Sequence, residues 1–207
     1  MNSGDVWVCR AMQDSTLVKP FLTADIWDDD EKADTAGKAL KRFRLGHPIP
    51  SNLFPSECFV NDMMKKVRNL PPIFECASFW VVNEELATVL RHFDIGKTTF
   101  HPTKLFQFNR KTEIRGKYFF INFDTRKDTF LPEQSENVRK NRPTIPWALG
   151  PLVKDGDVAV DQGALVGADL WFEETMWKAI FMSGDLVDAL RAAKLTRRLG
   201  LRKCKVI

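Results

Sequence analysis

Residues 78–93 read SFWVVNEELATVLRHF, and this stretch decides the fold of the chain. Its first part is aromatic and β-branched, which is typical of a buried strand. Asn83 then stands where a helix N-cap is expected, and Glu84 and Glu85 suit the positively polarised first turn. Apolar residues recur at helical spacing from there to residue 93. The stretch therefore predicts a strand that runs directly into a capped amphipathic helix.

The same pattern returns near the C-terminus, where residues 179–193 read AIFMSGDLVDALRAA. Ser183 aligns with Asn83 and Leu186 aligns with Leu86, at a constant offset. Two copies fall short of the three or more that a solenoid needs. We interpret them as two strand-cap-helix units of one fold. The alternative is that any strand feeding a capped amphipathic helix has this pattern.

The remaining elements are shorter. Residues 118–123 read YFFINF, which is too aromatic for a helix and is typical of a central strand. Residues 6–9 predict an opening strand that joins the same sheet, whereas residues 125–156 have no period and predict a long loop. We expect an α+β fold, a single mixed sheet with two strand-cap-helix units packed on it. One domain would cover residues 1–207, with an irregular N-terminal lobe at 1–70 and the sheet and helix core at 71–207.

Composition and charge are those of an ordinary globular protein. The 207 residues are 44% hydrophobic and 28% charged, and the formal charge is only +4. No run approaches eighteen apolar residues, and the N-terminus lacks the pattern of a cleaved leader, so we expect a cytoplasmic protein without a membrane span. The four cysteines form no CxxC pair, which predicts buried free thiols in a reducing compartment.

The sequence shows no motif of catalysis or cofactor binding. Its three histidines have no HExxH spacing, and neither a GxSxG elbow nor a Gly-rich phosphate loop occurs. We therefore expect no enzyme and no cofactor. The aspartates at 28, 29, 30 and 34 lack the glycine and the final glutamate of an EF-hand loop, so we expect no metal site there.

Several motifs together resemble a known family. They are FWVVNEEL at 79–86, FHP at 100–102, YFFIN at 118–122 and FMSGDL at 181–186, followed by a short terminal strand. In these the chain resembles the immunity proteins of bacterial polymorphic-toxin systems, in particular immunity family eleven, over residues 74–128 and 171–207. Asn83 stands where the family has serine, and asparagine caps a helix equally well. The resemblance implies a protein that binds and neutralises a cognate toxin, without catalysis and without a cofactor.

Two stretches have the charge and the anchoring side chains that a protein interface uses. The first is a compact acidic run with one aromatic residue, which would complement a basic toxin cleft. The second is a loop with arginines and a tryptophan. The predicted contact residues are Trp27, Asp28, Asp29, Asp30, Glu31, Arg139, Arg142 and Trp147. The alternatives are a solvated turn or helix start for the acidic run, and a buried Trp147 that clamps its loop.

A basic C-terminal segment supports a second hypothesis, a nucleic-acid-binding protein. Its cations are Lys194, Arg197, Arg198, Arg202, Lys203 and Lys205. Such a run binds phosphates if it lies on one face. A solvated helix end and a lysine-protected edge strand explain the same residues without a ligand. A hydrolase that uses scattered carboxylates is the third hypothesis.

Overall fold

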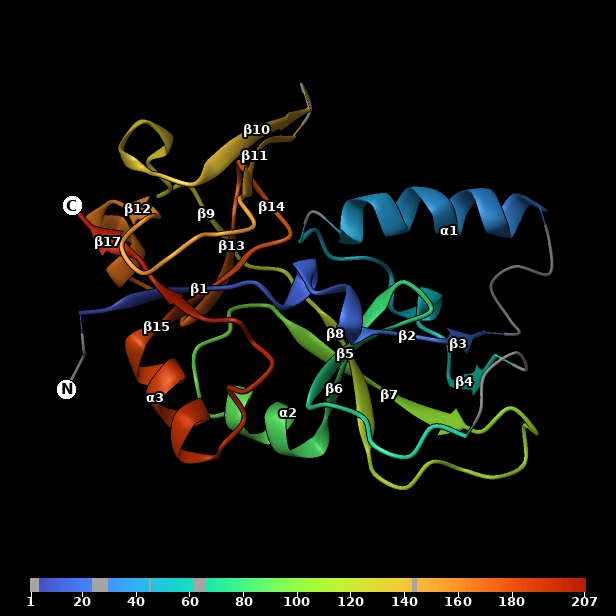
Figure 1. The fold of residues 1–207 in the computed structure, drawn as a ribbon. Helices are drawn as coiled ribbons and strands as arrows, with labels where there is room; N and C mark the ends of the chain where they lie inside the picture. The colour runs from blue at the N-terminus through green and yellow to red at the C-terminus, as the bar shows by residue number, and fades with distance from the viewer. Residues whose placement is uncertain (1–3, 24–29, 45, 62–65, 143–144) are drawn as a thin grey trace. The chain divides into compact units, whose positions relative to one another are not determined.

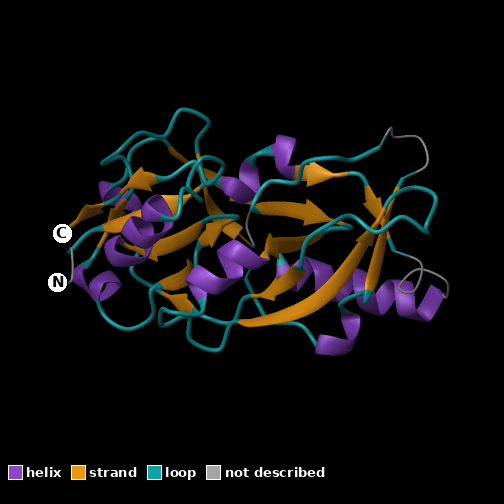
Figure 2. Ribbon diagram, turned by 90° about the horizontal axis from the view of Figure 1, so that it is seen from below, coloured by secondary structure: helices purple, strands orange, loops and turns teal. Residues whose placement is uncertain are grey.

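The computed structural model describes residues 4–23, 30–44, 46–61, 66–142 and 145–207, without the side chains of 30–36, 141–142 and 145–146. The chain divides into two compact units. We call Asp14–Thr88 with Thr98–Phe123 the ring unit, and Met1–Gln13 with Val89–Lys97 and Asp124–Ile207 the terminal unit. Across the described residues, short helices are set among many short strands (Figure 1, Figure 2).

A sheet with strand order β2-β5-β6-β8-β7-β4-β3 forms the ring unit. The strands are β2 Val18–Lys19, β3 Phe21–Leu22, β4 Glu57–Val60, β5 Ile73–Cys76, β6 Phe79–Asn83, β7 Thr99–Phe106 and β8 Tyr118–Asn122. The middle strand is β8, where the sequence predicted a central strand. Although β2 and β3 stand at opposite ends of this order, only Pro20 separates them in the chain. One extended segment therefore pairs with both outer strands and closes the sheet into a ring.

Pro20 suits this junction because it has no N–H to donate to either ladder. Its carbonyl accepts a hydrogen bond from the Asn61 backbone at 2.7 Å. Aromatic rings fill the space on one side of the sheet, where the ring centroids of Phe79 and Phe120 lie 5.5 Å apart. The helix α1 (Asp30–Phe43) adds Phe43, whose centroid lies 5.6 Å from that of Phe79. Burial of these rings is the main force that holds the ring unit together.

Within the ring unit, two buried side-chain amides hold extended segments against the strands of the sheet. Asn122 accepts from the Ile49 N–H at 3.1 Å through Oδ1 and donates to the Ile49 carbonyl at 3.0 Å through Nδ2. Gln107 does the same with Val67, at 3.1 Å through Oε1 and 2.6 Å through Nε2. Each amide replaces a backbone bridge, so that a segment outside the ladder still has its polar groups paired.

Both predicted helix caps are confirmed. The helix α2 (Glu84–Leu90) begins after β6, and Asn83 Oδ1 accepts from the Leu86 N–H at 2.9 Å. In the terminal unit, α3 (Gly184–Ala192) begins after its own strand, and Ser183 Oγ accepts from the Leu186 N–H at 3.2 Å. The sequence repeat is thus a structural repeat of a strand, a cap and a helix.

The terminal unit contains three smaller sheets among its described residues. Their strand orders are β16-β1-β15-β13-β9, β10-β11-β14 and β12-β17. The bounds are β1 Val6–Cys9, β9 Arg126–Lys127, β10 Val138–Arg142, β11 Ile145–Leu149, β12 Ala159–Val160, β13 Leu170–Glu173, β14 Met176–Trp177, β15 Ile180–Ser183, β16 Arg202–Lys203 and β17 Lys205–Val206. In the two units together, the described residues form short 3-10 helices at Ala11–Gln13, Ser15–Leu17, Ser51–Leu53, Pro132–Gln134 and Gln162–Leu165. Stacked rings of Trp171 and Phe181, 5.9 Å apart, lie in the core of this unit.

The prediction of a single mixed sheet is wrong, although the α+β class is confirmed. The unit β6-α2 belongs to the ring, whereas β15, which precedes α3, belongs to a separate sheet with β1 and β13. The opening strand β1 likewise pairs with β15 and β16, not with the ring. The long loop predicted for residues 125–156 contains the strands β9, β10 and β11, which have two to five residues each and are too short to show a period. The prolines and alternating charges of that range favoured a loop, and the prediction is wrong for these strands.

Candidate functional site

The predicted acidic contact stretch lies partly outside the described residues. Trp27, Asp28 and Asp29 are not described, and of Asp30 and Glu31 only the backbone is described. These two residues begin α1, which is where the macrodipole favours an acidic residue. A helix start accounts for the two positions, and a contact surface is compatible with them. The acidic stretch therefore stays a prediction.

The second predicted stretch is a β-hairpin. Strands β10 and β11 pair antiparallel, with Arg139 opposite Ala148, Lys140 opposite Trp147, and Arg142 opposite Ile145. The structure thus brings the three predicted residues Arg139, Arg142 and Trp147 to one hairpin. Because side chains alternate along a strand, Arg139 and Trp147 project from opposite faces of it. A partner that touched both would have to approach an edge of the hairpin.

Trp147 is half-buried and packs on the core of the terminal unit. Its ring meets that of Phe130 edge-on, with centroids 6.2 Å apart, and the Lys140 Nζ lies 5.5 Å from its centroid on the same hairpin. Strand β11 also pairs with β14, where Trp147 lies beside the buried Met176. The tryptophan therefore anchors the hairpin to the core. Arg139 and Lys140 are its exposed cations.

Among the residues whose side chains are described, Glu173 is the most enclosed charged one, with 1% of its surface exposed. Its carboxylate accepts from the Thr129 N–H at 2.7 Å, the Thr129 hydroxyl at 2.6 Å, the Phe130 N–H at 3.1 Å and the Trp171 Nε1–H at 2.7 Å. Burial raises the pKa of Glu173, and these bonds oppose the shift. Lys127 lies above the Trp171 ring at 3.6 Å, and burial lowers its pKa. A substrate has no access to so enclosed a group, and the network ties residues 129–130 to β13.

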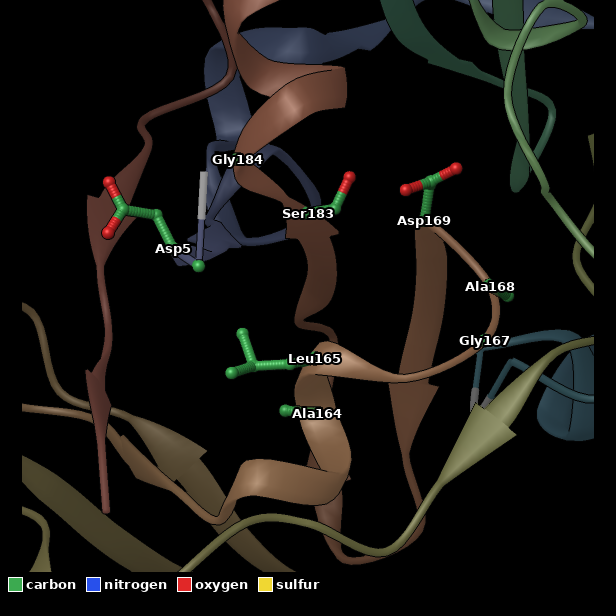
Figure 3. A pocket seen from close by; sticks show the side chains of 9 residues that line it. Asp5, Ala164, Leu165, Gly167, Ala168, Asp169, Ser183 and Gly184 are labelled. Atoms are coloured by element: carbon green, nitrogen blue, oxygen red, sulfur yellow. The ribbon is translucent and has the colours of Figure 1, made fainter. Parts of the chain in front are cut away.

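A pocket of about 250 Å³ lies beside the start of α3 (Figure 3). Its described lining consists of Gly4, Asp5, Ala164, Leu165, Gly167, Ala168, Asp169, Ser183 and Gly184. The polar side chains have internal roles: Asp5 pairs with Lys203 at 2.9 Å, Asp169 accepts a backbone N–H at 3.0 Å, and Ser183 is the helix cap. Leu165 extends into the space from below. This described lining has no nucleophile next to a base.

The four cysteines are buried free thiols, as predicted. Burial raises the pKa of the Cys9 thiol to about 12 and raises that of Cys76 well above its usual value, so both stay protonated near neutrality. Within the described residues, His, Cys, Asp and Glu side chains nowhere gather in threes as a metal site would require. In the same part of the chain, every helix is too short or too polar to cross a membrane.

One exposed surface was missed by sequence reasoning. Leu22, Phe59 and Phe106 stand in register on β3, β4 and β7, and Phe108 follows directly after β7. Phe108 is 53% exposed and Leu22 is 50% exposed, and the guanidinium of Arg110 lies 4.9 Å from the Phe59 ring centroid. We call these five residues the tip face. The available signal was the pair of phenylalanines two positions apart, followed by arginine and lysine at 110 and 111.

Exposed aromatic and cationic surfaces, without an assembled catalytic set among the described residues, are typical of a protein that acts by binding another protein. Comparison with family models agrees. The model described as Immunity protein family (Imm11) matches residues 12–205. The chain therefore belongs to the Imm11 immunity protein family, as its motifs predicted. A search of curated proteins finds no match.

Proposed function

We propose that this protein binds a cognate antibacterial toxin and neutralises it by occluding the toxin's active site or substrate site. The family match carries the proposal, because it spans nearly the whole chain and segments of both units. The whole of residues 1–207 would then act as one immunity domain. The protein would act stoichiometrically by binding, without catalysis or a cofactor. Its four buried free thiols support a reducing compartment, so we place this action in the bacterial cytoplasm.

The toxin contact is proposed to involve the two stretches that the sequence indicated. The acidic stretch Trp27, Asp28, Asp29, Asp30 and Glu31 would face a basic toxin cleft, since opposite charges speed association. The hairpin would present Arg139 and Arg142 beside the core-packed Trp147. The support for the hairpin is that its described cation at 139 is exposed.

Nucleic-acid binding through the C-terminal cations has weaker support. Arg202 donates to the Val153 carbonyl at 3.0 Å and to the Leu201 carbonyl at 2.8 Å, and Lys203 pairs with Asp5 at 2.9 Å. Both cations lie on β16, at the edge of its sheet. Internal bonds and edge protection account for them without a phosphate ligand.

Co-expression tests the proposed function. If the proposal holds, the gene immediately upstream encodes the cognate toxin, and the C-terminal domain of its product is the toxin domain to test. That domain is induced in a sensitive strain, with this protein or with an unrelated immunity protein as control. We expect growth only with this protein, and a complex of the two that survives affinity capture and gel filtration. Growth arrest despite equal expression, together with no captured complex, would overturn the proposal.

The acidic stretch has its own test. Asp28, Asp29 and Asp30 are changed together to Ser, and Trp27→Ala is prepared separately. We expect each variant to capture less toxin at an unchanged melting temperature, because the changes remove charge complementarity or an anchor. Undiminished capture by both folded variants would remove the acidic stretch from the interface and leave the hairpin.

A further inference from the structure

We propose that the tip face is a further docking surface for the toxin, in addition to the two stretches named above, and that Phe108 enters an apolar pocket with an acidic rim on the toxin. The inference rests on the proposed function, because it names a surface for the same binding event. The residues of the tip face belong to β3, β4 and β7, whose ribbons Figure 1 labels, and to the connection that follows β7.

The first observation is a row of apolar side chains on the outer side of the sheet. Pairing places Leu22 beside Phe59 and Phe59 beside Phe106. Their neighbours Phe21, Cys58 and Leu105 are buried, and alternation along a strand places them on the opposite side. Leu22 keeps half of its surface exposed, and the Phe59 and Phe106 rings lie 6.0 Å apart. Exposed apolar side chains gathered in this way mark an interaction site more often than scattered ones do.

The second observation is that hydrogen bonds fix the tip that carries Phe108. Asn109 Oδ1 accepts from the N–H groups of Lys111 at 3.1 Å and Thr112 at 3.0 Å, and its Nδ2 donates to the Thr112 hydroxyl at 2.9 Å. The Gln107 N–H donates to the Thr112 carbonyl at 2.8 Å. Arg110 holds a left-handed backbone with a φ of 53°, which costs a non-glycine residue about 1 kcal/mol or more. A side chain presented on an ordered tip loses little entropy on binding, so Phe108 is suited to be an anchor.

The third observation is charge. The tip adds the exposed cations Arg110 and Lys111 next to Phe108. Arginine and aromatic residues carry much of the energy of protein interfaces. Two cations next to an exposed phenylalanine therefore fit an acidic rim around an apolar pocket.

Nucleic acid is also anionic, but the tip face suits it less. Proteins that bind single strands stack successive bases on open aromatic faces. Here Arg110 already lies over the ring of Phe59, and Phe108 is a single exposed ring at a turn. A lone phenylalanine next to two cations is closer to an anchor for a protein pocket.

The test measures binding of the purified toxin domain encoded upstream to variants of the full chain. Phe108→Ser removes the anchor, and Leu152→Ser is the matched control, since Leu152 is 75% exposed but lies in the terminal unit. We expect the dissociation constant to rise about tenfold or more for Phe108→Ser and to stay within about twofold for the control. Both variants should keep the melting temperature of the parent. An unchanged dissociation constant for a folded Phe108→Ser protein would overturn the docking surface.

A second arm tests the partner's chemistry. Arg110→Asn removes the charge and keeps a residue that tolerates the left-handed backbone, and Lys154→Asn is an exposed control in the terminal unit. The parent's affinity should fall with added salt, and Arg110→Asn alone should flatten that dependence. Twenty-nucleotide single-stranded DNA and RNA are titrated in parallel. Tight oligonucleotide binding that Phe108→Ser abolishes would overturn the protein partner.

The two proposals fail in different ways. If the parent protein binds the toxin domain and protects cells, but Phe108→Ser does both equally well, only the tip face is wrong. If the parent neither binds nor protects, the proposed function itself is wrong, whatever the variants do.

Discussion

Gln107 offers the sharpest test of how the ring unit holds its outer segments. Gln107→Met keeps a side chain of similar volume, so the cavity contribution is small, but removes both hydrogen bonds to Val67. Each such bond contributes about 0.5–1.5 kcal/mol net, which gives about 1–3 kcal/mol for the pair. Val67 is only half-buried, so water can reach its freed backbone groups. We therefore expect the lower half of that range.

Equilibrium urea unfolding and amide hydrogen exchange measure this effect. The free energy of unfolding should fall by about 1–2 kcal/mol, and the Val67 N–H should exchange much faster in the variant. Gln134→Met is the matched control, because Gln134 is exposed on a 3-10 helix and a change there should stay within about 0.5 kcal/mol. Unchanged exchange at Val67 together with an unchanged unfolding midpoint would refute the role that we assign to the amide.

Three further predictions concern stability. Asn83→Ala and Ser183→Ala should each lower the free energy of unfolding by about 0.5–2 kcal/mol, and the loss should be larger for Asn83, whose cap bond is shorter. A variant that kept its stability but bound the toxin less tightly would show that the residue contacts the toxin instead. Ile121→Ala and Leu186→Ala should each cost about 2–5 kcal/mol in thermal or urea unfolding by leaving cavities, and unchanged melts would contradict their placement in the core. Burial lowers the pKa of His101 from 6.5, so the fold favours the neutral ring, and the free energy of unfolding should fall as the pH drops through 6.5 towards the folded pKa. His101→Phe should therefore reduce the difference between the free energies of unfolding at pH 7.5 and at pH 5.5. If the parent and the variant show an equal difference, His101 is not the source of the pH dependence.

Local structure was predictable from the sequence where a single physical rule dominates. The caps at Asn83 and Ser183 follow from residue type and position alone, and both form the expected hydrogen bond. The central strand β8 follows from an aromatic run bounded by polar residues. The family followed from the same motifs, which recur in both units.

Long-range pairing was not predictable in the same way. The ring closes because residues 18–22 pair with β5 on one side and β4 on the other, and strands of two residues have no hydrophobic period. Cys58, Phe59 and Val60 belong to β4, a strand that is held by its pairing with β3 and β7 more than by local preference. The strands β9, β10 and β11, within the predicted loop at residues 125–156, were missed for the same reason.

The candidate site shows the same limit. Arg139 and Trp147 are close in sequence and share a hairpin. The alternation of side chains nevertheless places them on opposite faces, and Trp147 packs against the core of the terminal unit. The tip face combines Leu22, Phe59 and Phe108, which are far apart in the chain. Only the pairing of β3, β4 and β7 brings them together, so the local signal at residues 106–111 could have indicated one part of this surface but not the whole.

A stoichiometric inhibition titration tests the central claim most directly. The activity of the toxin domain that is captured in the co-expression test is measured while the purified protein is added in increasing amounts. Binding that occludes the toxin predicts a linear loss of activity that ends at one equivalent. Toxin activity that persists with the protein in large molar excess would contradict the account.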